Sequence, residues 1–432
     1  MRICNIVFCA SAVVLLIVWA ERPAQAAGWT QEAKLLADDA ERGDTLGVCV
    51  GLSGSTAIVG APGRDDNGVT SGAAYIFRKS GSGWQQTAKL IPADNVEYDH
   101  IGAGVDVFGS KAILGAYGDG DRGEMAGAAY IFEDNGSGWQ EVAKLTASDG
   151  AAWDYFGQSV ALSGSRAIVG SWRDDERTGS AYVYEDTGVG WTQVAKLTAS
   201  DGAAYDEFGQ SVAIDGSRAL VGAYHADAGA QDTGAAYLFE DAGSGWQQVA
   251  KWTNSDAVAF DNFGRSVDLD GSTAIVGAYG DDDFGHLSGA AYIFRDTGSG
   301  WEEVAKLTAS DGAAYDYFGK SVALSGSMAV IGAEGDDDNG EDSGSAYVFQ
   351  DTGAGWVEIA KLLPADSKVD DYFAWGGYGA GVDISGSTVI VGNHSDDENG
   401  PAAGAAYIFT PEPATLALLA VGRLLLIRRR AR

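Results

Sequence analysis

The sequence predicts an all-β fold, a seven-bladed β-propeller with four-stranded antiparallel blades, from three observations. One line recurs almost unchanged, as KLTASDGAAWDYFGQSVALSGS at 144–165 and KLTASDGAAYDYFGKSVALSGS at 306–327. Tryptophans that follow glycine-rich turns recur at spacings of 55, 52, 55, 55 and 55 residues, at Trp84, Trp139, Trp191, Trp246, Trp301 and Trp356. Each unit holds four short segments of strand composition between turns rich in Gly, Ser and Asp, and such a fixed period is typical of repeat architectures.

In one unit the strands are expected at 318–325, 328–333, 345–350 and 356–362. Segments such as AAYIF are apolar on both faces, so each strand has to lie between two neighbouring sheets. Four-stranded units that cover one another in this way pack radially into a propeller.

The two ends of the repeat array predict how the ring closes. The units begin near Leu46, Ile101, Phe156, Phe208, Phe263, Phe318 and Tyr378. The last unit reaches Thr410 after only three strands, whereas the strand-like segment WTQEAKLLA at 29–37 precedes the first unit. We therefore expect the N-terminal strand 29–37 to complete the last blade.

Both ends outside the propeller, which is expected at 27–410, have the composition of targeting segments. Residues 1–26 begin with a basic Arg2, continue with an apolar stretch over 6–20 and end in the small-residue motif AQA. This pattern is typical of a secretory signal peptide.

The tail at 411–432 consists of Pro-Glu-Pro, an apolar segment at 414–427 that Arg423 interrupts, and an arginine-rich end. This layout resembles the PEP-CTERM sorting signal of exported bacterial proteins. The resemblance implies processing by an exosortase-type enzyme, and contact with the membrane only through the tail before processing. Together the two ends predict an exported protein of the cell envelope, the cell surface or the medium.

The charge of the chain restricts its partners. It has 61 acidic and 28 basic residues and a formal net charge of −33, which disfavours nucleic acid and anionic membranes and favours cations and basic partners. Cys4 and Cys9 lie in the expected signal peptide, so Cys49 is the only cysteine of the propeller. An internal disulfide and a cysteine zinc site are therefore excluded.

The unit FGQSVALSGSRAIVG…GSAYVYED…GWTQVAKL, which begins at Phe156, resembles the FG-GAP repeat of integrin α-subunit propellers and of many bacterial exported proteins. Seven such copies cover 29–410. The resemblance implies a D-x-D-x-D-G calcium loop between the first and second strands of a blade. Here that turn reads only SGS or DGS, as at 163–165, which is too short to wrap an ion, so a cation would have to bind on the opposite face.

The acidic residues concentrate on that opposite face. Because strands alternate in direction, the loops between strands 2 and 3 share one face with the links between blades. These loops hold 22 acidic residues and the links hold 19, which together make 41 of the 61 in the chain. All four histidines, His100, His225, His286 and His394, lie on the same face.

Three interpretations of this acidic face stay open: a solvated surface, a divalent-cation site, and a direct binding site for a basic or sugar partner. Oxygen is the only ligand type offered in number, so calcium is the expected cation. The calcium candidates are Asp119, Asp121, Asp281, Asp282, Asp283, Asp336, Asp337, Asp338, Asp396 and Asp397. Trp172 and Trp375 are candidates for stacking on sugars, with a structural role as the alternative.

The sequence contains no H-E-x-x-H, Walker, dinucleotide-binding or G-x-S-x-G motif, so we expect a protein that is not an enzyme and has no catalytic residues. The predicted function is non-catalytic binding or adhesion at the cell surface or in the extracellular matrix, with calcium assistance and a polysaccharide or surface protein as partner. A secreted polysaccharide-acting hydrolase or lyase is the alternative, and a structural coat or matrix protein is the third. A pocket with converging His, Arg and carboxylate groups would favour the enzyme, and an open acidic face would favour binding.

Overall fold

The computed structural model describes residues 28–377 and 380–412. The expected signal peptide, Tyr378 and nearly all of the expected sorting tail lie outside the described residues. Within them, no helix is long and apolar enough to span a membrane.

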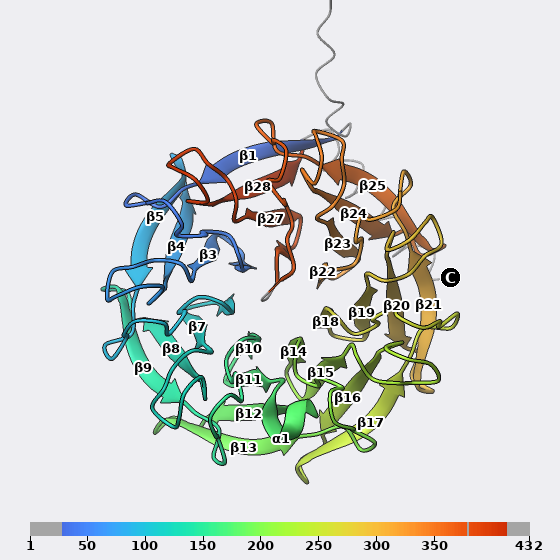
Figure 1. Cartoon of the computed structure of the whole chain (residues 1–432), viewed down its shortest axis with the longest axis horizontal. Coiled ribbons are helices and arrows are strands. Elements are labelled where there is room, and N and C mark those ends of the chain that lie inside the picture. The colour runs from blue at the N-terminus through green and yellow to red at the C-terminus, as the bar shows by residue number, and fades with distance from the viewer. Residues whose placement is uncertain (1–27, 378–379, 413–432) are drawn as a thin grey trace, which may run out of the picture.

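The described chain forms a ring of seven four-stranded antiparallel sheets, as predicted (Figure 1). Blade 1 contains β2 (Val50–Ser53), β3 (Thr56–Ala61), β4 (Ala73–Ser80) and β5 (Gly83–Leu90); blade 2 contains β6 (Val105–Phe108), β7 (Lys111–Ala116), β8 (Ala128–Asp134) and β9 (Trp139–Leu145); blade 3 contains β10 (Val160–Ser163), β11 (Arg166–Ser171), β12 (Ser180–Asp186) and β13 (Trp191–Leu197), with the short helix α1 (Asp174–Arg177) in its 2–3 loop. Blade 4 contains β14 (Val212–Asp215), β15 (Arg218–Ala223), β16 (Ala235–Asp241) and β17 (Trp246–Trp252); blade 5 contains β18 (Val267–Asp270), β19 (Thr273–Ala278), β20 (Ala290–Asp296) and β21 (Trp301–Leu307); blade 6 contains β22 (Ser321–Ser325), β23 (Met328–Ala333), β24 (Ser345–Asp351) and β25 (Trp356–Leu362).

Blade 7 contains β26 (Val382–Ser385), β27 (Thr388–Asn393) and β28 (Ala405–Pro411), and its outer strand is β1 (Trp29–Leu35) from the other end of the chain. The register runs antiparallel from Trp29 opposite Pro411 to Leu35 opposite Ala406. The predicted closure is therefore confirmed, and Figure 1 shows β1 along the outer edge of β28.

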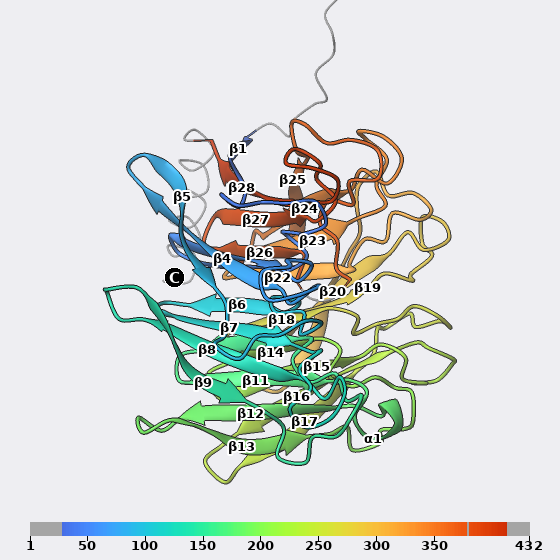
Figure 2. The same ribbon diagram turned by 60° about the vertical axis from the view of Figure 1, so that its left-hand side comes forward.

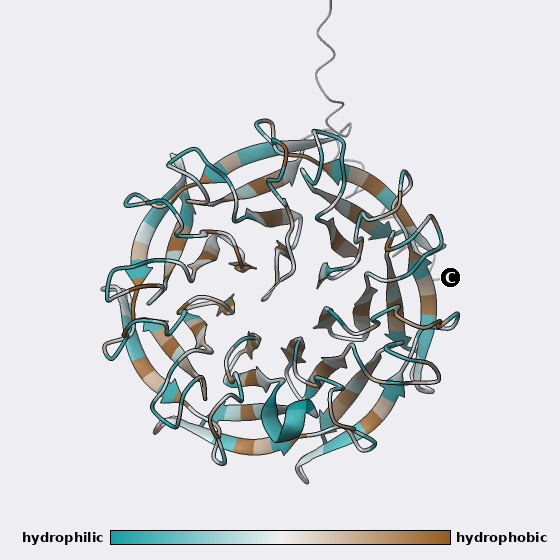
Figure 3. Ribbon diagram, viewed as in Figure 1, coloured by the Kyte–Doolittle hydropathy of each residue, from teal (hydrophilic) through white to brown (hydrophobic). Residues whose placement is uncertain are grey.

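The core consists of apolar layers between adjacent blades, which explains why the strands are apolar on both faces. Figure 3 shows hydrophobic residues along the strands and hydrophilic residues in the loops. One layer joins Leu220 and Leu238 of blade 4 to Val267 and Tyr292 of blade 5, and all four side chains are buried.

The Phe-Gly opening has a packing function. Phe263 is fully buried, and its ring lies 5.6 Å from that of Tyr292 in an edge-on arrangement. The following Gly264 has a φ of +93°, and a Cβ there would lie 2.3 Å from the backbone oxygen of Ala235. Only glycine fits this turn without strain.

Blade 7 begins earlier than the sequence predicts. Phe373 fills the buried phenylalanine position, with its ring 5.7 Å from that of Tyr407. Val382 lies nine positions after Phe373, whereas Val322 lies four positions after Phe318 in blade 6. The extra residues shift the Gly-rich stretch that resembles the start of a unit, so the prediction near Tyr378 was wrong.

Candidate binding face

The loops between strands 2 and 3 lie on the same face as the links between blades, as predicted. Among the described residues, six of the seven loops pair with the next link in a parallel bridge, for example Gly127 with Phe156 and Gly289 with Phe318. Figure 2 shows these loops, including the one with α1, on one side of the ring. We call this side the loop face.

A lysine from the outer strand of each blade organises the acids of the loop face. In blade 5, Nζ of Lys306 lies 2.7 Å from a carboxylate oxygen of each of Asp256, Asp281 and Asp283. The hydroxyl of Tyr292 lies 2.8 Å from Asp256 and 2.9 Å from Asp281. These groups come from the incoming link, the 2–3 loop, the third strand and the outer strand, and they meet at one point.

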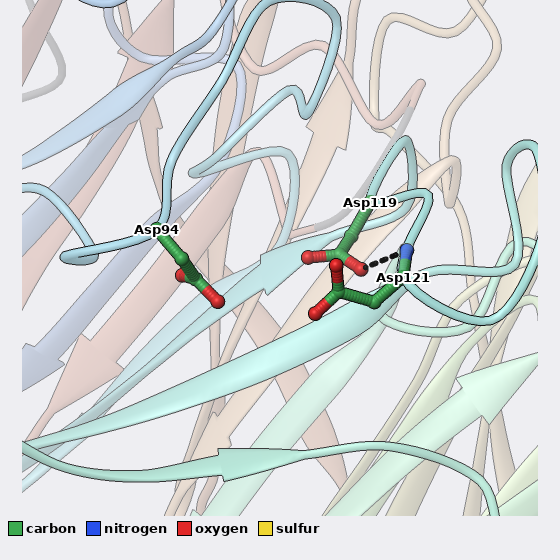
Figure 4. A group of neighbouring side chains, drawn as sticks. All are labelled: Asp94, Asp119 and Asp121. Carbon is green, nitrogen blue, oxygen red and sulfur yellow. Dashed lines mark hydrogen bonds between the residues drawn. The ribbon is translucent and has the colours of Figure 1, made fainter.

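Four blades repeat this arrangement in full. The other three lysine–carboxylate sets are Lys144 with Asp94, Asp119 and Asp121; Lys361 with Asp311, Asp336 and Asp338; and Lys34 with Asp366, Asp396 and Glu398. Figure 4 shows the carboxylates of Asp94, Asp119 and Asp121 turned toward a common space. In blades 1 and 3 the lysine pairs with two acids, Lys89 with Asp39 and Asp66, and Lys196 with Asp149 and Asp174. In blade 4, Ala226 and Ala228 replace two of the acids and Lys251 pairs with Asp201 alone.

The lysines occupy the places that a metal ion would use. The carboxylate oxygens of Asp94, Asp119 and Asp121 lie within 4.8 Å of one another, as do those of Asp256, Asp281 and Asp283, so both groups could hold a metal ion. The same groups are hydrogen-bonded to an ammonium. Burial works to lower the pKa of Lys306, but hydrogen bonds to the three carboxylates dominate and raise it above its usual value.

The structure divides the predicted calcium candidates into two groups. The first and third acids of a loop face the lysine, and the first is buried in every case: Asp119, Asp281, Asp336 and Asp396. The middle acids turn to their own loops instead. Asp282, Asp337 and Asp397 accept hydrogen bonds from the backbone N–H five residues later, at 2.7, 2.9 and 2.9 Å.

The two predicted tryptophans lie in different surroundings. Nε1 of Trp172 donates a hydrogen bond of 2.7 Å to Gln158, and the guanidinium groups of Arg173 and Arg177 each lie 5.3 Å from the Trp172 ring. The ring of Trp375 lies 4.4 Å from that of His394. Both tryptophans belong to the loop face, but they do not meet in one site.

The residues beside Trp375 cross the mouth of the central channel. Arg265 of blade 5 donates hydrogen bonds of 2.8 Å to the carbonyl oxygens of Gly376 and Gly377 in blade 7. The channel itself has a volume of about 330 Å³ and is lined by the inner strands. Burial raises the pKa of Asp106 in the channel wall to about 7 and that of Asp268 to about 6.

Comparison with known proteins agrees with this architecture. The FG-GAP repeat model matches seven segments, residues 29–77, 84–132, 139–184, 191–239, 246–294, 301–349 and 356–409. The chain belongs to the FG-GAP repeat family. A search of curated proteins found no match.

Three solved structures resemble this FG-GAP propeller at 10% sequence identity, which is a likeness of fold alone. They are Sqt1 of Saccharomyces cerevisiae (TM-score 0.45, covering 86% of this chain and 83% of that one), a functionally unknown protein from Desulfotomaculum acetoxidans DSM 771 (0.46, 76% and 86%) and a chain of the Mitotic Checkpoint Complex (0.47, 95% and 99%).

The FG-GAP blades have tight turns between their first and second strands, at the position of the calcium loop that the resemblance implies. In blade 3, Ser163 pairs directly with Arg166, so only two residues form the turn. The expectation that this turn is too short to wrap an ion agrees with that register.

One group of His, Arg and carboxylate side chains does converge on the loop face. The carboxylate of Glu207, which is only 1% exposed, forms an ion pair with Arg177 and lies 3.7 Å from Nδ1 of His225. Burial lowers the pKa of His225. Sequence inspection did not single out Glu207, because its position before Phe208 is occupied by residues of different types in the other blades.

Proposed function

We propose that this FG-GAP propeller is a non-catalytic binding protein that acts outside the cytoplasm and meets its partner with the loop face. The observation that carries the proposal is the construction of that face. All seven blades contribute a 2–3 loop and a link. Backbone bridges hold six of the loops against the next link, and in blade 6 the N–H of Phe373 donates a hydrogen bond to the carbonyl oxygen of Ser343. Such a surface is rigid before binding, which lowers the entropic cost of association.

The charge of the face supports a partner that is neutral or basic. Many carboxylates remain exposed even where a lysine contacts them, such as Asp121 at 68% and Asp283 at 54% of the side chain. The expected signal peptide and sorting tail support a location at the cell envelope or surface, and the partner we propose there is an extracellular polysaccharide or a surface protein.

Binding to the protein's own cell-surface material tests the proposal. In the triple variant Glu97→Lys, Glu124→Lys and Glu341→Lys, three exposed acids of the loop face change sign. We expect the parent to sediment with envelope or matrix material and the variant to lose most of that binding.

A control with the same change in charge is Glu133→Lys, Glu185→Lys and Glu302→Lys, near the opposite face. Equal loss of binding in the control would show that net charge alone is responsible. Absence of binding by the parent would refute the proposed function.

Calcium assistance stays a prediction, and it requires that calcium compete with the lysines for the carboxylates. A divalent cation that enters the group around Asp281 has to displace the ammonium of Lys306, which already contacts all three carboxylates. We therefore propose that the lysines replace calcium as the internal cations of this face. Equal melting temperatures in calcium and in chelator would agree with this, and a large rise in calcium would contradict it.

A polysaccharide-cleaving activity is the second candidate, and the convergence of Arg177, Glu207 and His225 is the observation that favours it. A buried carboxylate beside a histidine is a possible acid–base pair. Release of reducing ends from polysaccharide, abolished in Glu207→Gln, would support this function. Equal amounts of reducing ends released by the parent and by the variant would refute it.

A further inference from the structure

One position in the links between blades carries exposed aromatic rings. It lies three residues before the buried Phe, Ile or Leu that opens each blade. In five blades it is aromatic, and the residues are Tyr98, Trp153, Tyr205, Phe260 and Tyr315, with exposures of 50, 44, 62, 51 and 52%. We call these five residues the aromatic crown.

The backbone at this position is unfavourable for an aromatic residue. The crown residues have φ values from 67° to 74°, in the left-handed region. The two blades without an aromatic have Gly43 (φ 85°) and Asp370 (φ 61°) there, and glycine and aspartate adopt this region more readily. The rings are thus kept at positions where the backbone conformation favours other residues. Because the rings are exposed, little burial of apolar surface offsets the unfavourable backbone conformation.

Duplication of a single blade does not explain the rings. The link before blade 2 reads NVEYDH and that before blade 5 reads AVAFDN, whereas the link before blade 6 reads GAAYDY. The neighbouring residues have diverged and the ring itself changes among Tyr, Trp and Phe. Aromatic character is the property that persists.

The backbone at the crown positions is also held by the preceding blade. The backbone N–H groups of four crown residues donate hydrogen bonds to carbonyl oxygens of the preceding 2–3 loops: Tyr98 to Val69, Trp153 to Glu124, Phe260 to Gln231 and Tyr315 to His286, at 2.8–2.9 Å. The aspartate after each ring accepts a backbone N–H of the same link, as Asp316 does from Ala313 at 2.7 Å. Each ring therefore projects from a fixed backbone.

We propose that the aromatic crown binds a polysaccharide that lacks acidic groups, with sugar rings stacked on the individual aromatic side chains. This inference rests on the proposed function and names its ligand and its site. The apolar C–H face of a pyranose fits an exposed aromatic ring, and the carboxylates around the crown accept hydrogen bonds from sugar hydroxyls.

The arrangement of the rings favours a repetitive glycan over other partners. Among the described residues no ring contact joins two members of the crown, so each ring is a separate platform, and a protein partner more commonly requires one continuous apolar patch. The acidic surroundings repel uronic acids, sulfated sugars and anionic lipids. A repeating ligand that engages several equivalent rings gains affinity by multivalency.

Substitution by asparagine tests the crown, because asparagine removes the ring and tolerates the left-handed region. The variants are Trp153→Asn alone and the triple Trp153→Asn, Tyr205→Asn and Tyr315→Asn, with Phe108→Asn as control. Phe108 is 49% exposed at the end of β6, away from the loop face. The probes in affinity electrophoresis are soluble β-1,3-glucan, hydroxyethylcellulose, galactomannan and dextran, with polygalacturonate as the acidic probe.

We expect at least one neutral probe to retard the parent and the control, no retardation by polygalacturonate, and at least tenfold weaker binding by the triple variant. The melting temperature of the triple variant should stay equal or rise. Binding by the triple variant equal to that of the parent, retardation by polygalacturonate only, or no retardation by any neutral probe would overturn the proposal. A fall in melting temperature would identify the rings as packing residues and would also overturn it.

The envelope-binding experiment separates this inference from the proposed function. If the triple asparagine variant still binds envelope material as the parent does, the crown proposal fails and the proposed function stands. If the parent itself does not bind, both fail.

Discussion

Replacing Lys306 by methionine removes the ammonium from a group of three carboxylates and leaves the apolar part of the side chain in place. Asp281 in this group is 6% exposed, whereas Asp256 and Asp283 are about half exposed at 46 and 54%. Breaking a fully buried ion pair costs about 3–5 kcal/mol, and the exposed partners reduce that figure. We expect a loss of about 2–3 kcal/mol, or about 3 °C in melting temperature at ~2.1 cal/mol/K of unfolding entropy per residue.

The same variant should bind calcium. Without the ammonium, three carboxylates with oxygens within 4.8 Å of one another form a set that suits a divalent cation. Calcium at about 100 times its dissociation constant would restore about 2.7 kcal/mol, close to the expected loss. Urea unfolding of parent and variant, with calcium at about 100 times its dissociation constant or with chelator, measures both effects.

Lys251→Met is the matched control. Lys251 occupies the equivalent place in blade 4 but pairs with Asp201, which is half exposed. Its loss should cost about 0–1 kcal/mol, and calcium should not restore it. Equal losses in the two variants, or a parent that gains as much stability from calcium as Lys306→Met does, would refute the conclusion that lysine takes the place of the metal ion.

Three further predictions follow from the fold. Deletion of residues 29–37 exposes the edge of β28, so we expect aggregation in size-exclusion chromatography, and a soluble, equally stable monomer would contradict the closure. Burial raises the pKa of Asp99 and of Asp316 to about 6. Because protonation of these two carboxyl groups favours the folded state, the free energy of unfolding should fall as the pH rises from about 4 to above 6. Urea unfolding of the double variant Asp99→Asn and Asp316→Asn should show a weaker fall between about pH 5 and pH 7.5. Phe373→Ala and Phe318→Ala should each cost about 3–5 kcal/mol, and a much smaller loss for Phe373→Ala would show that Phe373 does not open blade 7.

The blades could be predicted because their signals are local. A strand that is apolar on both faces and a period of 55 residues are properties of short segments, and they survive in any copy of the unit. Blade 7 was misplaced at its start because the insertion before Val382 moves the glycines, while Phe373 keeps its distance of 55 residues from Phe318. The period was the better guide than the resemblance of the glycine-rich stretch.

The acids of the loop face could be counted from the sequence, but their partners could not. Lys144 and Asp94 are 50 residues apart, and they meet because the incoming link and the outer strand of one blade lie side by side. A lysine that recurs in the apolar outer strand of every unit was the available signal. It was overlooked because the acids alone were considered as ligands.

The sequence by itself determined the number of blades, the closure by residues 29–37 and the concentration of acids on one face, because each depends on repeat spacing and strand direction. Only the tertiary structure decided which acids are neutralised by lysine and which aromatic rings stay exposed. Trp252, Trp172 and Trp153 look alike in the sequence, yet the first is buried, the second packs between arginines and the third is exposed on a left-handed turn. Those differences arise from the contacts between neighbouring blades, which exist only once the ring has closed.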